Sequence, residues 1–334
     1  MRNFEILPFD GNYTELAALI KRSWPLEHRT HIDFTRSYLK YLLESPDIDP
    51  RLTLGGYIGN QLVCFCFSKE KQIHIGKKRY RALFNSLATT DPDFSHMFPY
   101  LKLNEHMLTG AENRGYDLYY GYTAYGIKNN EIADLFARRK GYLFHHISTF
   151  NMLLADIEQI SPLRHSGDGI EILPFNPDNP GETAQCMTLI FRHTRQCAVC
   201  EALSENVFVY RFSDSPYSRT KIIKKGGEIK GLINFSILDF TGIRPKKTAI
   251  FYNWFAHMFS ASEKKKILAS IIPELKENGV SGISIPNTGY FNTGDLLEMG
   301  FVSYPFKQGK TSLSIVTFTD EIHLNRNTFW LEIT

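Results

Sequence analysis

The stretch Phe4-Glu5-Ile6-Leu7-Pro8-Phe9-Asp10 near the start of the chain returns as Ile170-Glu171-Ile172-Leu173-Pro174-Phe175-Asn176, at an offset of 166 residues in a chain of 334. One such pair is weak evidence for a duplication, but another landmark recurs at a similar spacing. Phe94-Ser95-His96-Met97-Phe98 is answered by Phe255-Ala256-His257-Met258-Phe259. Landmarks that recur in one order at nearly constant spacing indicate a duplicated domain. The two halves therefore share one fold.

Composition places the chain among ordinary globular proteins. It is 43% hydrophobic and 22% charged, and its formal net charge is only +3, so we expect no nucleic-acid partner. No stretch approaches the ~20 apolar residues that cross a bilayer, and the first residues lack the pattern of a signal peptide. Five cysteines in so long a chain form no disulfide framework. We expect a soluble, cytoplasmic protein without a membrane span. The sequence leaves the oligomeric state open.

Hydrophobic periodicity and turn residues predict alternating strands and helices in each half. The order in the first half is a strand at 4–9, helices at 13–24 and 35–44, strands at 51–58, 61–68 and 81–89, a helix at 99–113, a strand at 116–123, a helix at 130–140 and a long strand at 142–154. The second half repeats this order, with a long helix at 183–203 and a final hairpin of strands at 301–306 and 311–318 around Gln308-Gly309.

These elements predict an α/β fold with a mixed, mostly antiparallel sheet in each half. The strands before and after the main helix of each half are expected to be parallel neighbours. Because the stretch 161–169 is polar, we place the domain boundary there and predict domains at 1–160 and 168–334.

The order of elements resembles the GNAT superfamily of acyl-CoA N-acyltransferases. The tandem arrangement is similar to the two-domain members: the Eis-like acetyltransferases, the N-myristoyltransferases and the FemABX-type aminoacyl transferases. Thr90-Asp91-Pro92-Asp93-Phe94 lies where the family approaches its phosphate loop, and Asn130, Ala133 and Gly141 follow the family's Asn-x-x-Ala…Gly pattern. The resemblance implies two tandem GNAT-like domains, acetyl-CoA or another acyl-CoA as co-substrate, and no metal.

The phosphate loop departs from the family pattern. GNAT enzymes hold the CoA pyrophosphate with a glycine-rich loop at a helix N-terminus, where backbone N–H groups can approach the phosphates. Here the glycine positions carry large side chains, and Asp91 and Asp93 add negative charge. The second-half loop also lacks glycine but has a capping-box pattern, Ser260-x-x-Glu263. Which half binds CoA stays open. The candidate cofactor-binding residues are Phe94, Ser95, His96, Met97, Phe98 and Asn130.

The candidate catalytic residues are Tyr122 and Thr334. The tyrosine with which many family members protonate the leaving thiolate falls at Ala137, so a tyrosine of the preceding strand, Tyr122, is the candidate substitute. The alternative is that the aromatics of this strand simply alternate between its two faces. In two-domain relatives a terminal carboxylate can act as the base, which makes that of Thr334 the second candidate. The alternative for the last residues is an edge strand that completes the second sheet.

The resemblance implies transfer of an acyl group, in the first place acetyl, from a CoA thioester to an amine by direct attack. The acceptor would be a small-molecule amine, an amino sugar or a peptide, and the acyl chain length stays open. Two alternatives remain: a catalytically degenerate GNAT-like binding or scaffold protein, and a FemABX-like aminoacyl transferase.

One further pattern has the residue types of a zinc site. His193, Cys197 and Cys200 are spaced to share one face of a helix, and imidazole and thiolate are zinc ligands. Cys186 and Ile190 continue the same stripe, which favours a core face on which cysteine serves as a small apolar residue.

Overall fold

The computed structural model describes residues 3–24, 30–124, 129–160, 169–242, 245–304, 310–318 and 328–333. The chain forms two compact units. Unit 1 contains the described residues of Met1–Thr149 and Thr311–Asn325, and unit 2 those of Phe150–Lys310 and Arg326–Ile333. The predicted division into 1–160 and 168–334 differs from this because one segment of each half belongs to the unit of the other.

Unit 1 is built on a mixed sheet. The strands follow in the order β1 (Phe4–Pro8), β3 (Leu54–Ile58), β4 (Gln61–Ile75), β5 (Lys78–Thr90), β6 (Leu118–Ala124), β16 (Thr311–Thr317) and β7 (Leu143–Phe150). The pairs β1–β3, β3–β4, β4–β5 and β6–β16 are antiparallel. β5 and β6, which flank the main helix α3 (Pro99–Asn113), are parallel, as predicted.

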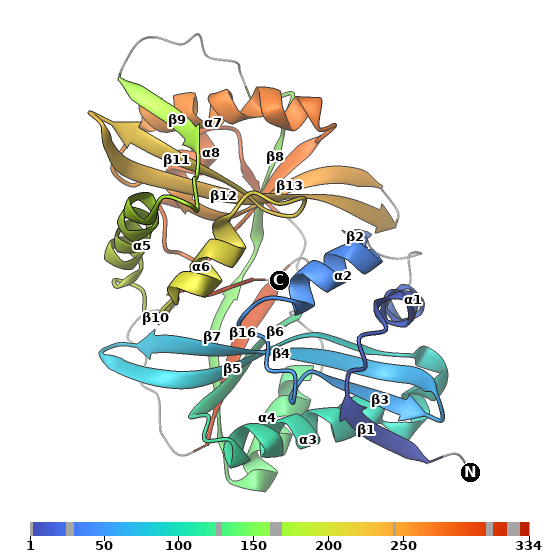
Figure 1. Ribbon diagram of the computed structural model, residues 1–334. Helices are drawn as coiled ribbons and strands as arrows, with labels where there is room; N and C mark the ends of the chain where they lie inside the picture. The colour runs from blue at the N-terminus through green and yellow to red at the C-terminus, as the bar shows by residue number, and fades with distance from the viewer. Residues whose placement is uncertain are drawn as a thin grey trace. The chain divides into compact units, whose positions relative to one another are not determined.

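Helices cover both faces of this sheet (Figure 1). On one face α1 (Tyr13–Ser23) and α2 (Arg36–Leu43) bury apolar side chains at helical spacing, such as Leu16, Leu19 and Leu39, against Phe65 and Leu87 of the sheet. On the other face lie α3 and α4 (Asn129–Lys140). The short strand β2 (Thr30–Ile32) lies between α1 and α2 in the chain, and the 3₁₀ helix η1 (Pro92–Met97) directly precedes α3.

Unit 2 repeats this arrangement. Its sheet has the order β15 (Val302–Ser303), β8 (Met152–Asp156), β14 (Gly282–Pro286), β13 (Lys246–Phe255), β12 (Glu228–Gly242), β11 (Arg219–Lys225) and β9 (Ile170–Pro174). β13 and β14 are parallel and flank α7 (Ala261–Glu277). One core cluster contains α7 and α8 (Thr293–Glu298), and another contains α5 (Pro180–Thr194) and α6 (Glu205–Phe212). Two short parallel strands, β10 (Val199–Glu201) and β17 (Phe329–Trp330), complete the unit.

The two units exchange strands. β16 comes from the end of the chain but lies between β6 and β7 of unit 1, with Leu313 opposite Tyr122. β8 continues the first half but lies between β14 and β15 of unit 2, with Leu154 opposite Ser284. The predicted long strand 142–154 is therefore interrupted at Asn151, and its two parts belong to different sheets. The predicted hairpin of 301–306 and 311–318 is wrong, because β15 pairs with β8 and β16 with β6.

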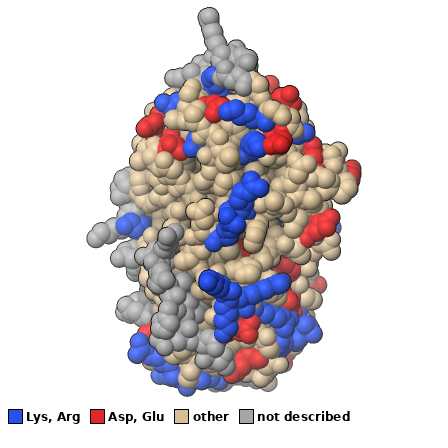
Figure 2. Space-filling model, turned by 90° about the vertical axis from the view of Figure 1, so that its left-hand side faces the viewer, with Lys and Arg blue, Asp and Glu red and all other residues tan. Residues whose placement is uncertain are grey.

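The predicted helix 183–203 is also too long. α5 ends at Thr194, and a turn in which the N–H of Cys197 donates to the carbonyl of Thr194 leads into β10. No helix in the described part of the chain is long and apolar enough to cross a membrane. On the face shown in Figure 2, Lys and Arg side chains form separate groups with Asp and Glu among them, and not one continuous basic surface.

Candidate functional site

In unit 1 the parallel strands β5 and β6 separate towards their ends. They pair only from Ala82 opposite Leu118 to Asn85 opposite Gly121. Beyond this point β5 continues along β4 and β6 along β16. A bulge in β5 accompanies the separation: the register with β4 shifts, and Leu87 has a positive φ of 56°. Ala88 is exposed beside it. Bulges of this kind bend a strand and are common beside active sites.

The loop that follows β5 leaves the start of α3 open. α3 has no side-chain N-cap, and its first residue is a proline, Pro99. The N-cap residue Phe98 has the left-handed conformation (φ 52°, ψ 46°) and a 63% exposed side chain. His96 is exposed as well. The first N–H groups of a helix have no partner within it and carry partial positive charge, so an anion is favoured there.

The acidic residue that begins this loop is neutralised within unit 1. Asp91 is only 2% exposed. Its carboxylate accepts a hydrogen bond from the backbone N–H of Asp93 (3.2 Å) and one from Nε of Arg22 on α1 (3.0 Å). The negative charge that the sequence placed next to a possible phosphate site is thus paired with a cation.

The corresponding loop of unit 2 carries the same His-Met-Phe tripeptide, but here the phenylalanine is buried, whereas Met258 is 55% exposed. Phe259 is buried, and Nε2 of His257 donates to the carbonyl oxygen of Tyr290 (2.9 Å). α7 begins with a complete capping box, in which the Glu263 carboxylate accepts the N–H of Ser260 (2.8 Å). A hydrogen bond from Lys225 and the one from Ser260 lower the pKa of Glu263 to about 2. The start of α7 is therefore occupied by a carboxylate of the chain itself.

The separated strands of unit 2 are bridged by a side chain. β13 and β14 pair only as far as Ile250 opposite Ser284. Beyond this point the backbone N–H of Trp254 in β13 donates to the hydroxyl of Tyr290 (2.7 Å), which follows β14. The Tyr290 ring packs against Phe255, with centroids 5.4 Å apart, and burial raises the pKa of its hydroxyl. A ligand that entered here would have to displace Tyr290.

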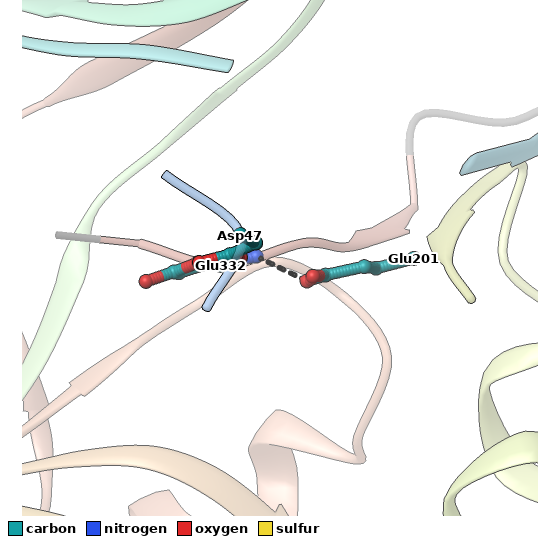
Figure 3. A group of neighbouring side chains, drawn as sticks. All are labelled: Asp47, Glu201 and Glu332. Carbon is teal, nitrogen blue, oxygen red and sulfur yellow. Dashed lines mark hydrogen bonds between the residues drawn. The ribbon is translucent and has the colours of Figure 1, made fainter. Parts of the chain in front are cut away.

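The last described residues are docked in unit 2. The indole Nε1 of Trp330 donates to Oδ1 of Asn253 (2.9 Å), and β17 pairs with β10. Figure 3 shows the next link, in which the backbone N–H of Glu332 donates to Oε2 of Glu201 (3.2 Å). Arg211 pairs with Glu201 at 2.9 Å. Asp47, drawn in the same figure, belongs to unit 1. The segment pairs with β10 and is not an edge strand of the unit 2 sheet that runs from β15 to β9.

Thr334 lies outside the described residues, so its role stays a prediction. So does that of Tyr122. Its ring meets that of Phe84 edge-on at 5.7 Å, and Tyr120 stacks on Phe84 at 5.0 Å. Tyr119 points to the other face, where its hydroxyl donates to Asn104 of α3 (2.9 Å). The aromatics of β6 therefore alternate between the two faces of the strand, as the packing alternative expected.

The remaining candidates for cofactor binding lie in two places. Phe94, Ser95, His96 and Met97 belong to η1, and Phe98 joins η1 to α3. Asn130 is in the first turn of α4, and its side chain lies outside what the structure describes. Ala137, at the family's tyrosine position, is fully buried in the core.

The three residues with zinc-ligand side chains do not share a helix face. His193 is on α5, Cys197 follows the turn after it, and Cys200 is on β10. Burial raises the pKa of the Cys197 thiol to about 12 and that of Cys200 to about 11. Both thiols are thus held in the neutral form that suits an apolar setting.

No protein-family model matches the sequence, and no curated protein matches it. Solved structures do. N-myristoyltransferase of Saccharomyces cerevisiae with bound myristoyl-CoA has a TM-score of 0.76 at 10% identity, over 96% of this chain and 80% of that chain. A GCN5-related N-acetyltransferase from Anabaena variabilis has 0.58 at 9% identity, over 94% and 72%. An Enterococcus faecalis protein described as a probable N-acyltransferase has 0.55 at 12% identity, over 94% and 72%. The chain has a tandem GNAT fold.

The predicted fold is thereby confirmed. Each GNAT-like unit has one strand–loop–helix–strand segment of the same order, β5–η1–α3–β6 in unit 1 and β13–α7–β14 in unit 2. Sequence reasoning found both loops but missed what distinguishes them, namely Tyr290 in unit 2 and Arg22 in unit 1. Tyr290 carries no signal beyond being an aromatic residue after a strand. Arg22 and Asp91 are 69 residues apart in the sequence, so no local pattern predicts their contact.

Proposed function

We propose that the chain transfers an acyl group from a CoA thioester to an amine, and that unit 1 holds the donor between the separated ends of β5 and β6. The fold supports this proposal, because structural neighbours are described as N-acyltransferases and one of them contains myristoyl-CoA. We choose unit 1 because the equivalent loops of the two units differ: the one before α3 leaves the helix start open, and the one before α7 does not. In unit 1 the helix start has no side-chain cap, whereas in unit 2 the capping box of Ser260 and Glu263 closes the helix start and Tyr290 bridges the strands.

The reaction would proceed by direct attack. The amine nitrogen forms a bond to the thioester carbonyl carbon, the bond from that carbon to sulfur breaks, and the amine loses a proton while the thiolate leaves. In such chemistry the protein orients the amine, accepts its proton and offers N–H donors to the carbonyl oxygen. We propose Tyr122 as the donor of a proton to the thiolate and the carboxylate of Thr334 as the acceptor of the amine proton. Phe94 to Phe98 and Asn130 would contact the CoA.

The acceptor in this proposal is a small-molecule amine, an amino sugar or a peptide, and the donor carries an acetyl or a longer acyl group. A binding or scaffold protein with a degenerate site is the second candidate, and the missing loop glycines favour it. Aminoacyl transfer in the manner of FemABX proteins is the third, and no observation in the structure favours it over acyl transfer.

The test is a thermal-shift titration with CoA, acetyl-CoA, octanoyl-CoA and myristoyl-CoA. A ligand at 100 times its Kd stabilises the protein that binds it by about 2.7 kcal/mol. We expect such a shift with at least one acyl-CoA, and we expect the variant Ala88→Trp to lose it. Ala88 is exposed at the bulge where the strands separate, so a tryptophan there should leave the core intact and obstruct a donor bound beside it. If no acyl-CoA shifts the melting temperature, the binding-protein alternative stands ahead.

A further inference from the structure

Arg22 is an exposed arginine that is fixed at one atom only. It lies in the last turn of α1, and 44% of its side chain is exposed. Its Nε donates to Oδ2 of Asp91 at 3.0 Å. Its other four N–H groups, on the two terminal nitrogens, have no partner among the described residues. A guanidinium has five N–H donors, and in this one only a single donor is used.

The carboxylate that holds Arg22 also fixes the loop before α3. Oδ1 of Asp91 accepts the backbone N–H of Asp93 (3.2 Å), and the backbone N–H of Asp91 donates to the carbonyl of Val63 in β4 (2.8 Å). Asp91 is buried, so it has little freedom to move. One rigid group therefore sets the position of the arginine relative to the loop, and the unused end of the guanidinium is placed in advance beside it.

We propose that Arg22 binds a phosphate group of the acyl-CoA donor. This inference rests on the proposed function and names the residue that would replace the missing glycines of the loop. A glycine-rich loop offers backbone N–H groups to phosphate, whereas an arginine offers a planar fork of N–H donors that matches two phosphate oxygens and brings a full positive charge. CoA has two kinds of phosphate that fit this chemistry, the 5′-pyrophosphate and the 3′-phosphate.

The experiment compares the affinities of purified variants for four ligands by calorimetry. The ligands are myristoyl-CoA, its dephospho form without the 3′-phosphate, myristoyl-pantetheine without any phosphate, and adenosine 3′,5′-bisphosphate without the acyl and pantetheine parts. For Arg22→Gln we expect myristoyl-CoA to bind about 10- to 100-fold more weakly, as for a lost charge-assisted hydrogen bond. Myristoyl-pantetheine should bind as it does to the wild type. The dephospho ligand shows which phosphate is bound: a loss that persists points to the pyrophosphate, and one that vanishes points to the 3′-phosphate.

Lys21→Gln is the matched control for charge. Lys21 is the exposed neighbour of Arg22 on the same helix turn and has no contact with Asp91. We expect its replacement to weaken binding of myristoyl-CoA less than about threefold, because an exposed charge without a fixed contact is screened by salt. An equal loss of affinity for myristoyl-CoA in Lys21→Gln and Arg22→Gln would overturn the proposal. It would mean that the ligand responds to the overall positive charge of α1 and not to a contact with Arg22.

Arg22→Gln leaves the buried carboxylate of Asp91 without its cation, which can disturb the loop by itself. The double variant Arg22→Gln/Asp91→Asn removes that charge. We expect it to bind myristoyl-CoA as weakly as the single variant. Recovery of wild-type affinity in the double variant, or an equal loss with myristoyl-pantetheine, would show that Arg22 is only structural and would overturn the proposal.

The same titrations distinguish a failure of the proposed acyl-transfer function from a failure of the inference on Arg22. If the wild type binds neither myristoyl-CoA nor its dephospho form but binds adenosine 3′,5′-bisphosphate, and Arg22→Gln abolishes that binding, the phosphate site stands and the acyl-donor function falls. If the wild type binds the acyl-CoA and Arg22→Gln binds it equally well, the inference on Arg22 falls and the proposed function stands. If the wild type binds none of the four ligands, both fall.

Discussion

Replacing Phe98 by glycine tests whether the loop of unit 1 is built to present this side chain outward. The left-handed conformation costs a residue with a side chain about 1–2 kcal/mol, and glycine avoids that cost. Against this gain stand about 0.5–1 kcal/mol for the greater freedom of glycine in the unfolded chain. Phe98 is 63% exposed, so the burial that is lost amounts to only about 1 kcal/mol. We expect a free energy of unfolding within about 1 kcal/mol of that of the wild type.

Phe259→Gly is the matched comparison, because Phe259 ends the same tripeptide in unit 2. It is 3% exposed, it belongs to the core cluster beneath α7, and its φ is negative. Removing a buried phenylalanine side chain costs about 3–5 kcal/mol, and nothing is gained from the backbone. Among the described non-glycine residues only Leu87 and Phe98 have positive φ, so the contrast between the two phenylalanines comes from conformation as well as burial.

The assay is urea unfolding of both variants, followed by circular dichroism, with thermal melts as a second measure. For a domain of this size 1 kcal/mol corresponds to about 2–4 °C in Tm. Phe259→Gly should lower Tm by at least about 6 °C, while Phe98→Gly should change it by no more than about 4 °C. Equal losses in the two variants would refute the reasoning, because they would mean that Phe98 is held by packing.

Two further predictions concern unit 2. Tyr290→Phe removes the hydroxyl that accepts the N–H of Trp254, and a buried N–H without a partner should lower the free energy of unfolding by about 1–3 kcal/mol in urea titrations; an unchanged value would show that water takes over the bond. Burial, with smaller effects of His257 and Arg192, lowers the pKa of His193 to about 4, so its unfolded form takes up more protons below pH 6.5, and stability should fall as pH drops from 6.5 to about 4. Thermal melts of His193→Phe should show a smaller fall over this range, and the same pH dependence as in the wild type would contradict the assignment.

The repeated architecture could be predicted because its signals are local. The alternation of 170–174 and the helical spacing after it are properties of adjacent residues, and they recur at 4–8. The parallel pairing of β5 with β6 follows from the helix α3 between them, since parallel strands need such a crossover. Both loops before the main helices were located for the same reason.

The exchanged strands could not be predicted from local pattern. Thr311–Thr317 alternates as a hairpin strand does, and a partner close in sequence is the usual expectation. Its actual partner β6 is far away in sequence, and alternation does not encode which strand lies beside it. The sequence predicts too long a helix at 183–203, because Cys197 and Cys200 keep the apolar spacing of α5 beyond its end at Thr194.

The candidate site remains a prediction, and the conformation of its loop could not be predicted from the sequence. From the sequence, Phe98 lies in the loop before the main helix, and its large side chain is expected to hinder the approach of a phosphate. In the structure its backbone takes a conformation typical of glycine and its side chain points to solvent. Likewise, the sequence predicts an unfavourable charge at Asp91, whereas in the structure Arg22 of α1 neutralises it. Both features depend on backbone angles and on distant contacts, which a single sequence does not display.

Because β8 and β16 are exchanged, the duplicated halves of the sequence do not coincide with the two structural units. The duplication repeats the same order of elements in both halves of the sequence, with an offset of 166 residues between the opening strands. Yet the segment 1–160 alone lacks β16, which pairs with β6 along seven residues, and 168–334 alone lacks β8, which pairs with β14 along five. Each inherited half would therefore expose the edge of a central strand, and exposed edges invite pairing between chains. The smallest piece of this sequence able to complete either sheet reaches across both halves.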